Sequence, residues 1–466
     1  MFPPETIDQL RPISSLLNFN KIQETAIAGM VIEDMENSLD PSQYGNRKQT
    51  SIQHYLVKLL QRILASVDKN SRKEINAVLC SFVDWRQAYS HQCHLLGIQS
   101  FQKNGVRRAL IPILTSYFQD REMRVKWRGK LSTPRKLPGG GAMGATLGNH
   151  EFSSQTNNNA DIVPQEDRFK WVDDLTVLEK INLVNIGLSS YNFKQHVASD
   201  ISTEGQFVDN KELKTQHYLD QINKWTENQK MEINSTKTKT IIFNFTNNFQ
   251  FRARLKLNEE IVETVTETKL LGTIITSDIK WKKNTNSIVK KAYARMELIR
   301  KLSGFGVPIS DLKTVYMAFV RSHCEASCNV WHSGLTLQEE NDLERVKQVA
   351  LKIILKDQYK NYNNAMNILD LQTLKDRRIQ LCLAFAKKSL GNPKMKQLFP
   401  PNNKIHTMDP RSYEHFQVLH ANTERMKNSP IVYIQNLLNT DIKDKEELDR
   451  IWKNLVQFYI FVTSEL

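Results

Sequence analysis

The sequence predicts an α+β protein with an antiparallel sheet in its middle part and an all-helical C-terminal part. Residues 75–85 form a nearly continuous apolar run, which is typical of a buried strand. Residues 168–179 have two β-like arms around an acidic pair, as expected of a hairpin. From about residue 283 the pattern becomes almost purely helical, with short breaks, which indicates a helical bundle.

The composition is that of a globular, basic protein. Of 466 residues, 40% are apolar, and 64 Lys and Arg face 50 Asp and Glu, which gives a formal charge of +14. This balance favours a polyanionic partner, nucleic acid first and a membrane surface second, although an unspecialised basic surface remains an alternative. No apolar run is long enough to span a bilayer and the start lacks a signal peptide, so we expect an intracellular protein. The five cysteines suggest buried thiols rather than a disulfide framework.

The first part of the chain combines helix, loop and strand. Residues 1–75 are predicted to be mixed helix and loop, and residues 51–67 have apolar side chains at helical spacing. The apolar strand that follows ends at Asp84. Residues 106–120 are predicted to be helical, and the alternating residues 123–129 are predicted to be a strand.

A glycine-rich run, LPGGGAMGATLG, occupies residues 137–148. Gly139, Gly141 and Gly144 match G-x-G-x-x-G by letter, but a dinucleotide-binding turn must follow a strand, and the preceding KLSTPRK is polar and contains a proline. A phosphate-binding P-loop would end in Gly-Lys-Ser/Thr, and this run does not. The context therefore excludes both kinds of phosphate loop.

The rest of the chain alternates strands and helices before the bundle begins. An Asn-rich polar stretch occupies residues 153–167, and an amphipathic helix is predicted over 213–231. Strands are predicted over 237–245 and, as a pair, over 267–276. The segment from 391 is rich in Pro and Asn and is predicted to be linker or loosely packed. The bundle helices are predicted over residues 287–303, 309–331, 341–355 and 374–390.

Three acids stand at predicted strand ends. Asp84 ends one strand, and Asp173 and Asp174 occupy the tip of the hairpin. If these strands are neighbours in one sheet, the carboxylates converge and can hold divalent cations for two-metal phosphoryl transfer. Mg²⁺ is the expected ion because it binds through a few carboxylates plus substrate phosphates. An Asp-Asp pair alone is also typical of a solvated turn.

Seven ordered segments resemble motifs of reverse transcriptases of the non-LTR retrotransposon type, and the chain is similar to a truncated or diverged copy of such an enzyme. The resemblance covers the chain from about residue 10 to about residue 390. It rests on LRPISSLL, DPSQYGNRKQTSIQHYL, FVDWRQAY, LPGGGAMGATLG, WVDD, MEINSTKTKTIIF and KLLGTII.

The resemblance implies a right-hand polymerase with partial fingers (1–75), a palm with a fingers insertion on the antiparallel sheet (76–282), an all-helical thumb (283–390) and a C-terminal helical or loop extension (391–466). The implied reaction is RNA-directed DNA synthesis, in which a nucleotide is transferred onto a primer 3′-OH. Two Mg²⁺ ions, which Mn²⁺ could replace, would be the cofactors. RNA template, DNA primer or duplex and dNTPs would be the partners.

Residue roles follow from the same resemblance. Asp84, Asp173 and Asp174 would be catalytic metal ligands, and Lys237 a catalytic general acid. Tyr89, five residues after Asp84, would lie against the incoming sugar and reject a 2′-OH. Arg47 and Lys48 would contact the triphosphate, and the glycines of the run would let template and base pair approach the backbone. The substrate-binding glycines are Gly139, Gly140, Gly141 and Gly144; the nucleic-acid-binding residues are Leu271 and Gly272 of the primer grip, and Lys290, Lys291, Arg295, Arg300 and Lys301 of the thumb.

Alternatives remain open at this stage. Tyr89 could be an ordinary buried aromatic side chain, and the cations could belong to solvated loops and helix faces. A second hypothesis is a retroelement remnant that binds nucleic acid with weak or no catalysis. A third is a host-domesticated protein with a structural role.

Overall fold

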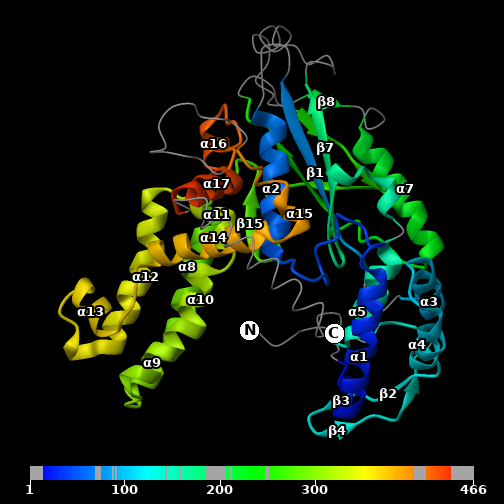
Figure 1. Ribbon diagram of the computed structural model, residues 1–466, viewed down its shortest axis with the longest axis horizontal. Helices are drawn as coiled ribbons and strands as arrows, with labels where there is room; N and C mark the ends of the chain where they lie inside the picture. The colour runs from blue at the N-terminus through cyan, green and yellow to red at the C-terminus, as the bar shows by residue number, and fades with distance from the viewer. Residues whose placement is uncertain are drawn as a thin grey trace. The chain divides into compact units, whose positions relative to one another are not determined.

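The computed structural model describes residues 14–68, 75–86, 89, 92–137, 139–141, 144–157, 159–183, 206–208, 213–246, 251–402 and 416–441 (Figure 1). Parts of the motifs named above, residues 10–13, 87–88, 138 and 142–143, lie outside this set. The chain divides into two units, which are described separately. Unit 1 comprises residues 1–51, 77–242 and 246–265, and unit 2 comprises residues 52–76, 243–245 and 266–466.

Unit 1 is built on a five-stranded sheet of order β13-β9-β1-β7-β6. β1 (Asn76–Val83) lies in the middle and is buried along almost its whole length, which explains its continuous apolar sequence. β6 (Arg168–Trp171) and β7 (Asp174–Asn182) form the predicted hairpin. The sheet is completed by β9 (Lys239–Phe243) and by β13 (Glu263–Thr264), which runs parallel to β9.

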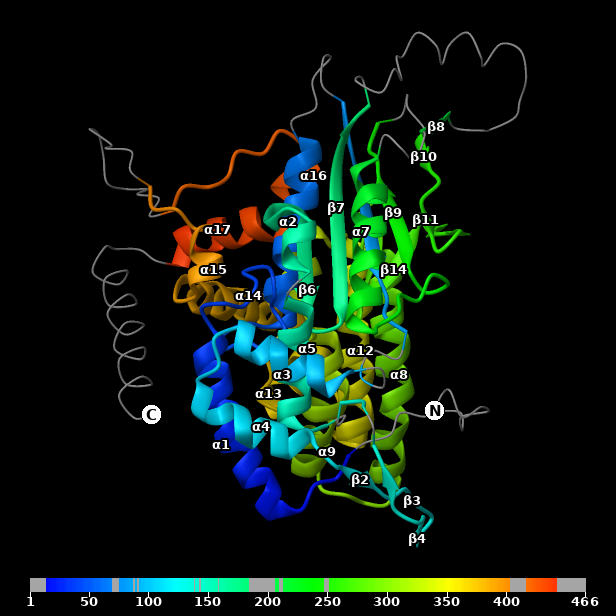
Figure 2. The ribbon, with the colours of Figure 1, turned by 90° about the vertical axis from the view of Figure 1, so that its right-hand side faces the viewer.

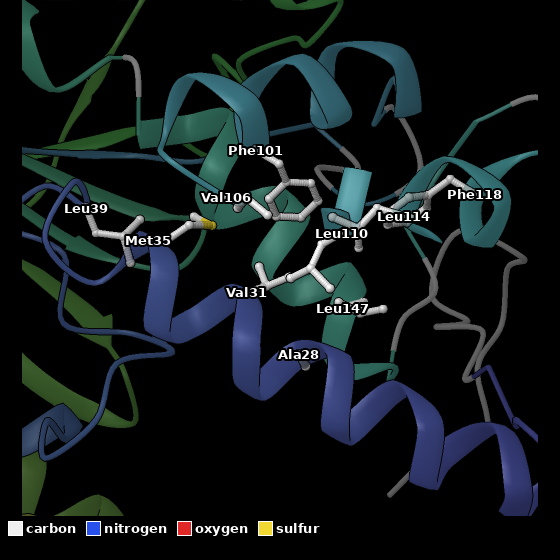
Figure 3. Close-up of a cluster of buried hydrophobic side chains, with 10 residues drawn as sticks. All are labelled: Ala28, Val31, Met35, Leu39, Phe101, Val106, Leu110, Leu114, Phe118 and Leu147. Carbon is white, nitrogen blue, oxygen red and sulfur yellow. The ribbon is translucent and has the colours of Figure 1, made fainter. Parts of the chain in front are cut away.

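Helices pack beside this sheet. α7 (Lys214–Gln229), the predicted amphipathic helix, contacts β7 (Figure 2). α1 (Asn18–Met35), α3 (His94–Lys103), α4 (Ile111–Phe118) and α5 (Thr146–Asn157) share a core, in which α1 and α5 face each other (Figure 3). The side chains of this core are Ala28, Val31, Met35, Leu39, Phe101, Val106, Leu110, Leu114, Phe118 and Leu147.

Short elements complete unit 1. The predicted strand over residues 123–129 is wrong in its length, because the structure has two-residue strands there. Helix α5 covers the start of the Asn-rich stretch, whose residues 153–156 are buried. The short strands are β2 (Glu122–Met123), β3 (Lys126–Trp127), β4 (Lys130–Leu131), β5 (Arg135–Lys136), β8 (Gln206–Val208), β10 (Phe251–Ala253), β11 (Lys256–Leu257) and β12 (Glu260–Ile261); the 3₁₀ turns are Arg108–Leu110, Ala160–Ile162 and Gln165–Asp167.

Unit 2 contains the predicted strand pair and the predicted helices. β14 (Glu267–Leu270) and β15 (Thr273–Thr276) form an antiparallel hairpin. α8 (Lys282–Gly304) packs along α12 (Leu337–Leu355) and buries Ala292, Met296 and Ile299. The predicted single helix over 309–331 is interrupted at Ser327, which has a φ of +52°. The remaining helices before residue 391 are α9 (Ile309–Val315), the π-helix Tyr316–Arg321, α10 (Ser322–Glu325), α11 (Cys328–Trp331), α13 (Tyr362–Ile368) and α14 (Leu374–Leu390), with 3₁₀ turns at His332–Gly334 and Lys356–Gln358.

The helix α2 (Ile52–Asp68) also belongs to unit 2. It contacts α16 (Glu424–Lys427) and α17 (Pro430–Asp441), and the Asp68 carboxylate accepts hydrogen bonds from the backbone amides of Asn422 and Thr423, both at 2.9 Å. The described part of the C-terminal segment is therefore well packed. Short helix α15 (Pro393–Lys396) is followed by Phe399, which is buried, as is Phe416. No helix among the described residues has the length and apolar character needed to cross a membrane.

Candidate active site

Asp84 directly follows the central strand β1. Its backbone amide donates to Thr238 Oγ1 at 3.2 Å, and its carbonyl accepts from the amide of Asn234 at 2.8 Å. The next residue, Trp85, forms an antiparallel bridge with Ile233. The MEINSTK segment thus continues the sheet beside the end of β1 and fixes the backbone at Asp84.

Asp173 and Asp174 come from the β6–β7 hairpin. Trp171 pairs with Asp174, so Val172 and Asp173 form a two-residue turn. Val172 has a φ of +56°, which is unfavourable for a β-branched side chain. Such strained residues persist only where surrounding contacts fix them, and they concentrate at functional sites.

The surrounding contacts come from the segment around Gln43. Its side-chain oxygen accepts hydrogen bonds from the amide of Val172 at 3.2 Å and from that of Gly45 at 3.3 Å. Gly45 lies so close to the turn that an added Cβ would stand 2.5 Å from Val172 Cγ2 and 2.7 Å from its backbone nitrogen. The DPSQYG motif is therefore packed directly against the turn that carries Asp173.

A buried ionic cluster anchors the same segment to β6. Asp40 accepts two hydrogen bonds from Arg168, at 2.8 and 2.9 Å, and lies 3.3 Å from Lys170 Nζ. Burial alone would raise the pKa of Asp40, but the hydrogen bonds from Arg168 and the charge of Lys170 outweigh it and lower the pKa to about 2. Breaking a buried pair leaves an unpaired charge and is costly, so the cluster holds β6 and the segment from Asp40 in one arrangement.

The three acids interact with one another. Burial, followed by the charges of Asp173 and Asp84, raises the pKa of Asp174 to about 7. The carboxyl groups thus lie within electrostatic reach, because β1 and β7 are neighbours in the sheet. Over the described residues, no three His, Cys, Asp or Glu side chains are grouped tightly enough to form a metal site by themselves.

The glycine run packs beside Tyr89. The amides of Gly140 and Gly141 donate to the carbonyls of Gln92 and Tyr89, at 2.8 and 2.6 Å. An added Cβ on Gly141 would stand 1.8 Å from Gln92 Oε1, and one on Gly139 would stand 2.9 Å from the Gln92 carbonyl. Gly140 has a φ of +91°, and Gly144 one of +93°. The space beside Gly139 and Gly141 is therefore occupied by the chain's own Gln92, and Tyr89 also lies against Gly141.

Tyr89 packs against this run and interacts electrostatically with Asp173. Its ring stacks on Phe152, with centroids 5.2 Å apart and an interplanar angle of 26°. Burial and the charge of Asp173 raise the pKa of its hydroxyl. The charge of Asp173 thus reaches the aromatic side chain, which also packs on the buried Phe152, and its contact with a sugar stays a prediction.

The predicted cations differ in their surroundings. Arg47 is bound within its own segment: its guanidinium donates to the Glu36 carboxylate and to the carbonyls of Glu36, Leu39 and Asp40. Its side chain is only 7% exposed, so a triphosphate contact would require this network to open. Lys48 is exposed. Lys237 is exposed too, and it lies one residue before Thr238, which contacts the Asp84 amide.

The remaining predicted residues lie in unit 2. Leu271 and Gly272 form the β14–β15 turn, with φ values of +46° and +89°. The five cations of α8 that were predicted to bind nucleic acid are all exposed, and Arg300 pairs with Glu297 at 3.1 Å. Arg295 and Lys291 both lower the pKa of His323, after burial, so they share the helix face near α10.

Sequence reasoning missed several residues that shape the site. From the sequence, Arg168 and Lys170 resemble ordinary cations of a hairpin, and no contact was predicted for Gln43. A signal was available, since two cations in a strand whose residues are otherwise buried require an acid partner. Gln92 and Phe152 gave no such signal.

Comparisons with known proteins give one related curated sequence. The chain is 25% identical over 340 residues to the probable RNA-directed DNA polymerase from transposon BS of Drosophila melanogaster, and the match covers 72% of the chain. The chain spans about a third, 34%, of that relative's length. No family model matches.

Solved telomerase structures are distantly similar. Apo telomerase from Candida tropicalis matches at 11% identity with a TM-score of 0.37, covering 81% of this chain and 60% of that one. Telomerase from Candida albicans, in complex with a fragment of telomeric RNA, matches at 10% identity with a TM-score of 0.39, covering 79% of this chain and 52% of that one. The curated sequence to which this chain is similar is thus a probable RNA-directed DNA polymerase of a transposon.

Proposed function

We propose that the chain is an RNA-directed DNA polymerase that uses Asp84, Asp173 and Asp174 to hold two divalent cations. The observation that carries the proposal is that Asp84 directly follows β1, that Asp174 begins the neighbouring strand β7, and that Asp173 stands in the turn before it. The charges of Asp173 and Asp84, after burial, raise the pKa of Asp174, in agreement with this placement. Groups of carboxyls that repel one another in this way are destabilised as anions and are stabilised by a cation. Carboxylate oxygens are also the donors that Mg²⁺ prefers.

The proposed reaction is nucleotide transfer onto a primer 3′-OH. The bound metal ions would neutralise the attacking and leaving oxygens. The chain would contribute by holding the carboxylates that bind these ions in position. The Asp40–Arg168–Lys170 cluster and the Gln43 contacts support this contribution, because they fix the turn on which Asp173 stands. Tyr89 would face the sugar of the incoming nucleotide, and Lys237 would serve as general acid for pyrophosphate.

We propose that Lys48, rather than Arg47, is the cation of this segment that reaches the triphosphate. Lys48 is exposed, whereas Arg47 is held by Glu36 and by three backbone carbonyls. In unit 2, the exposed cations of α8 and the turn at Leu271-Gly272 are proposed to contact the duplex backbone and the primer.

Primer extension tests the proposal. The full chain would be incubated with poly(rA)–oligo(dT), dTTP and Mg²⁺, and separately with Mn²⁺. Metal-dependent extension that Asp84→Asn removes supports the assignment. A chain that binds the primer–template but does not extend it with either metal would instead support the alternative of a nucleic-acid-binding remnant.

A further inference from the structure

Residues 121–137 of unit 1 form an exposed two-stranded ribbon that none of the roles above uses. β2 pairs with β5, and β3 pairs with β4, both antiparallel. Between the two pairs, the amide of Ser132 donates to the Val125 carbonyl at 3.0 Å, and the Val125 amide donates to Ser132 Oγ at 2.9 Å. Arg128 and Gly129 form the tip, both with positive φ. The ribbon is therefore a defined hairpin (Figure 1).

The ribbon is strongly basic. Its sequence from 121 to 136, REMRVKWRGKLSTPRK, has seven Lys and Arg against one Glu, a net charge of +6. Within the described residues, no ion pair is made by five of its exposed cations: Arg124, Lys126, Arg128, Lys130 and Arg135. Charges that the protein leaves uncompensated attract a polyanion.

The ribbon also exposes large apolar side chains between these cations. Trp127 is 60% exposed, and Val125 and Leu131 are exposed as well. Trp127 and Lys130 are direct cross-strand partners, and the Arg128 guanidinium lies over the Trp127 ring, 5.9 Å from its centroid. Exposed aromatic rings interleaved with cations form the kind of surface on which the bases of single-stranded nucleic acid stack while the cations follow its phosphates.

The chain position of the ribbon links it to the candidate site. The amide of Leu137 donates to the Arg121 carbonyl at 2.8 Å and closes the base of the hairpin. The glycines that pack against Tyr89 and Gln92 begin two residues later. A strand held on the ribbon would thus be held by a segment that leads directly into the site.

We propose that this ribbon is a binding surface for single-stranded nucleic acid, with Trp127 stacking on a base and Arg124, Lys126 and Lys130 contacting phosphates. The inference rests on the proposed function in one respect, the identification of the bound single strand as the unpaired part of the template. The binding itself is a property of the ribbon, and it is testable without any catalysis.

The experiment measures binding of the full chain carrying Asp173→Asn to a fluorescein-labelled single-stranded RNA and a DNA of the same sequence, by anisotropy in EDTA. The first variant adds Arg124→Gln, Lys126→Gln and Lys130→Gln, and leaves Arg128 in place because of its positive φ. The matched control removes three exposed cations elsewhere in unit 1, with Lys103→Gln, Lys214→Gln and Lys224→Gln. The second variant is Trp127→Ala, with Trp127→Phe as its conservative partner.

The ribbon triple variant is expected to lower the slope of log Kobs against log salt by about 2, since each phosphate contact on a single strand contributes about 0.7. The control triple should keep the parent slope. Trp127→Ala should weaken binding at least fivefold with an unchanged slope, and Trp127→Phe should retain most of the affinity, because base stacking requires only an aromatic face.

Equal slopes for the two triple variants would overturn the proposal, as would parental affinity of Trp127→Ala. A parent chain that binds through the ribbon but never extends a primer would overturn the proposed function and leave the ribbon assignment standing. A parent chain that extends primers, with ribbon variants that bind nucleic acid as well as the parent, would overturn the ribbon assignment and leave the proposed function standing.

Discussion

Asp84, at the end of β1, and Asp174, at the start of β7, stand on neighbouring strands, and the charge of the first contributes to raising the pKa of the second to about 7. Asp173 adds to the same effect. An arrangement that forces carboxyls together costs stability and therefore needs a function or a cation to explain it. The first two predictions test each side of this relationship.

Asp173→Asn is expected to abolish primer extension while leaving primer–template binding nearly unchanged. Removing a proposed metal ligand should raise the barrier by several kcal/mol, which lowers the rate by about 10³ or more. Single-turnover extension and anisotropy measure the two quantities. Glu166→Gln removes an exposed acid shortly before β6 and serves as the control, which should keep the parental rate. Extension by Asp173→Asn within about tenfold of the parent would contradict the site.

Asp174→Asn is expected to stabilise the fold at alkaline pH. Between pH 3.8 and about 7 the folded chain retains a proton on Asp174 that the unfolded chain has released. The free energy of unfolding therefore decreases as pH rises through this window and stays reduced above it. Removing the carboxylate should raise stability at pH 8 by about 1–2 kcal/mol, because partial exposure screens the effect.

Thermal unfolding of Asp174→Asn and the parent at pH 5 and pH 8 measures this difference. The gap in Tm should be larger at pH 8, and Mg²⁺ should narrow it by stabilising the parent, which has all three carboxylates. Asp40 titrates in the same way in both chains, so its contribution cancels from the difference in Tm. A Tm of Asp174→Asn at or below that of the parent at pH 8 would mean that the carboxyls do not repel one another.

Tyr89→Val is expected to raise incorporation of ribonucleotides relative to deoxyribonucleotides. The ring lies near Asp173 and stacks on Phe152, so its loss would open space on the sugar side of the proposed nucleotide site. The ratio of kcat/KM for rTTP and dTTP measures the change, and Tyr89→Phe, which keeps the ring, should retain the parental ratio. An unchanged ratio in Tyr89→Val, accompanied by a lower Tm, would assign Tyr89 to packing alone.

The elements that the sequence predicted correctly are those with strong local patterns. The β1 strand is apolar throughout because it is central, and the hairpin β6–β7 has alternating arms around a polar turn. The long helices α2, α7, α8, α12 and α14 were likewise evident from their apolar spacing. Local pattern was insufficient where a residue's role depends on a distant partner.

Arg47 illustrates this limit. In the sequence it stands beside Lys48, and nothing distinguishes the two. In the structure Arg47 is bound by Glu36, eleven residues away, while Lys48 is exposed. The same holds for α5, whose polar residues gave no helical signal. Its Asn157 donates to the Ser38 carbonyl and to Asn104. Tertiary hydrogen bonds thus stabilise a helix that the helix propensity of its residues does not favour.

The last prediction concerns Gly45, which is packed against the turn that carries Asp173. Gly45→Ala would place a methyl group 2.5 Å from Val172 Cγ2 and 2.7 Å from the backbone nitrogen of Val172. Because a backbone atom cannot rotate away as a side chain can, the turn must shift by a fraction of an ångström or more. Asp173 follows Val172 directly, so its carboxylate would shift too.

Gly45→Ala is therefore expected to reduce the single-turnover rate of extension by about 10²-fold, the cost of misplacing a reacting group by about 1 Å, with primer–template affinity unchanged. Gly29→Ala is the matched control, because Gly29 lies within helix α1 of the same unit and has nothing within 4 Å of the added Cβ. It should keep the parental rate and gain about 1 kcal/mol of stability from helix propensity.

Adding Val172→Gly to Gly45→Ala removes the closer of the two contacts and the positive-φ strain at once, and should recover part of the rate. If Gly45→Ala extends as fast as Gly29→Ala, the turn tolerates displacement, and the contact between the DPSQYG motif and the hairpin serves folding rather than catalysis.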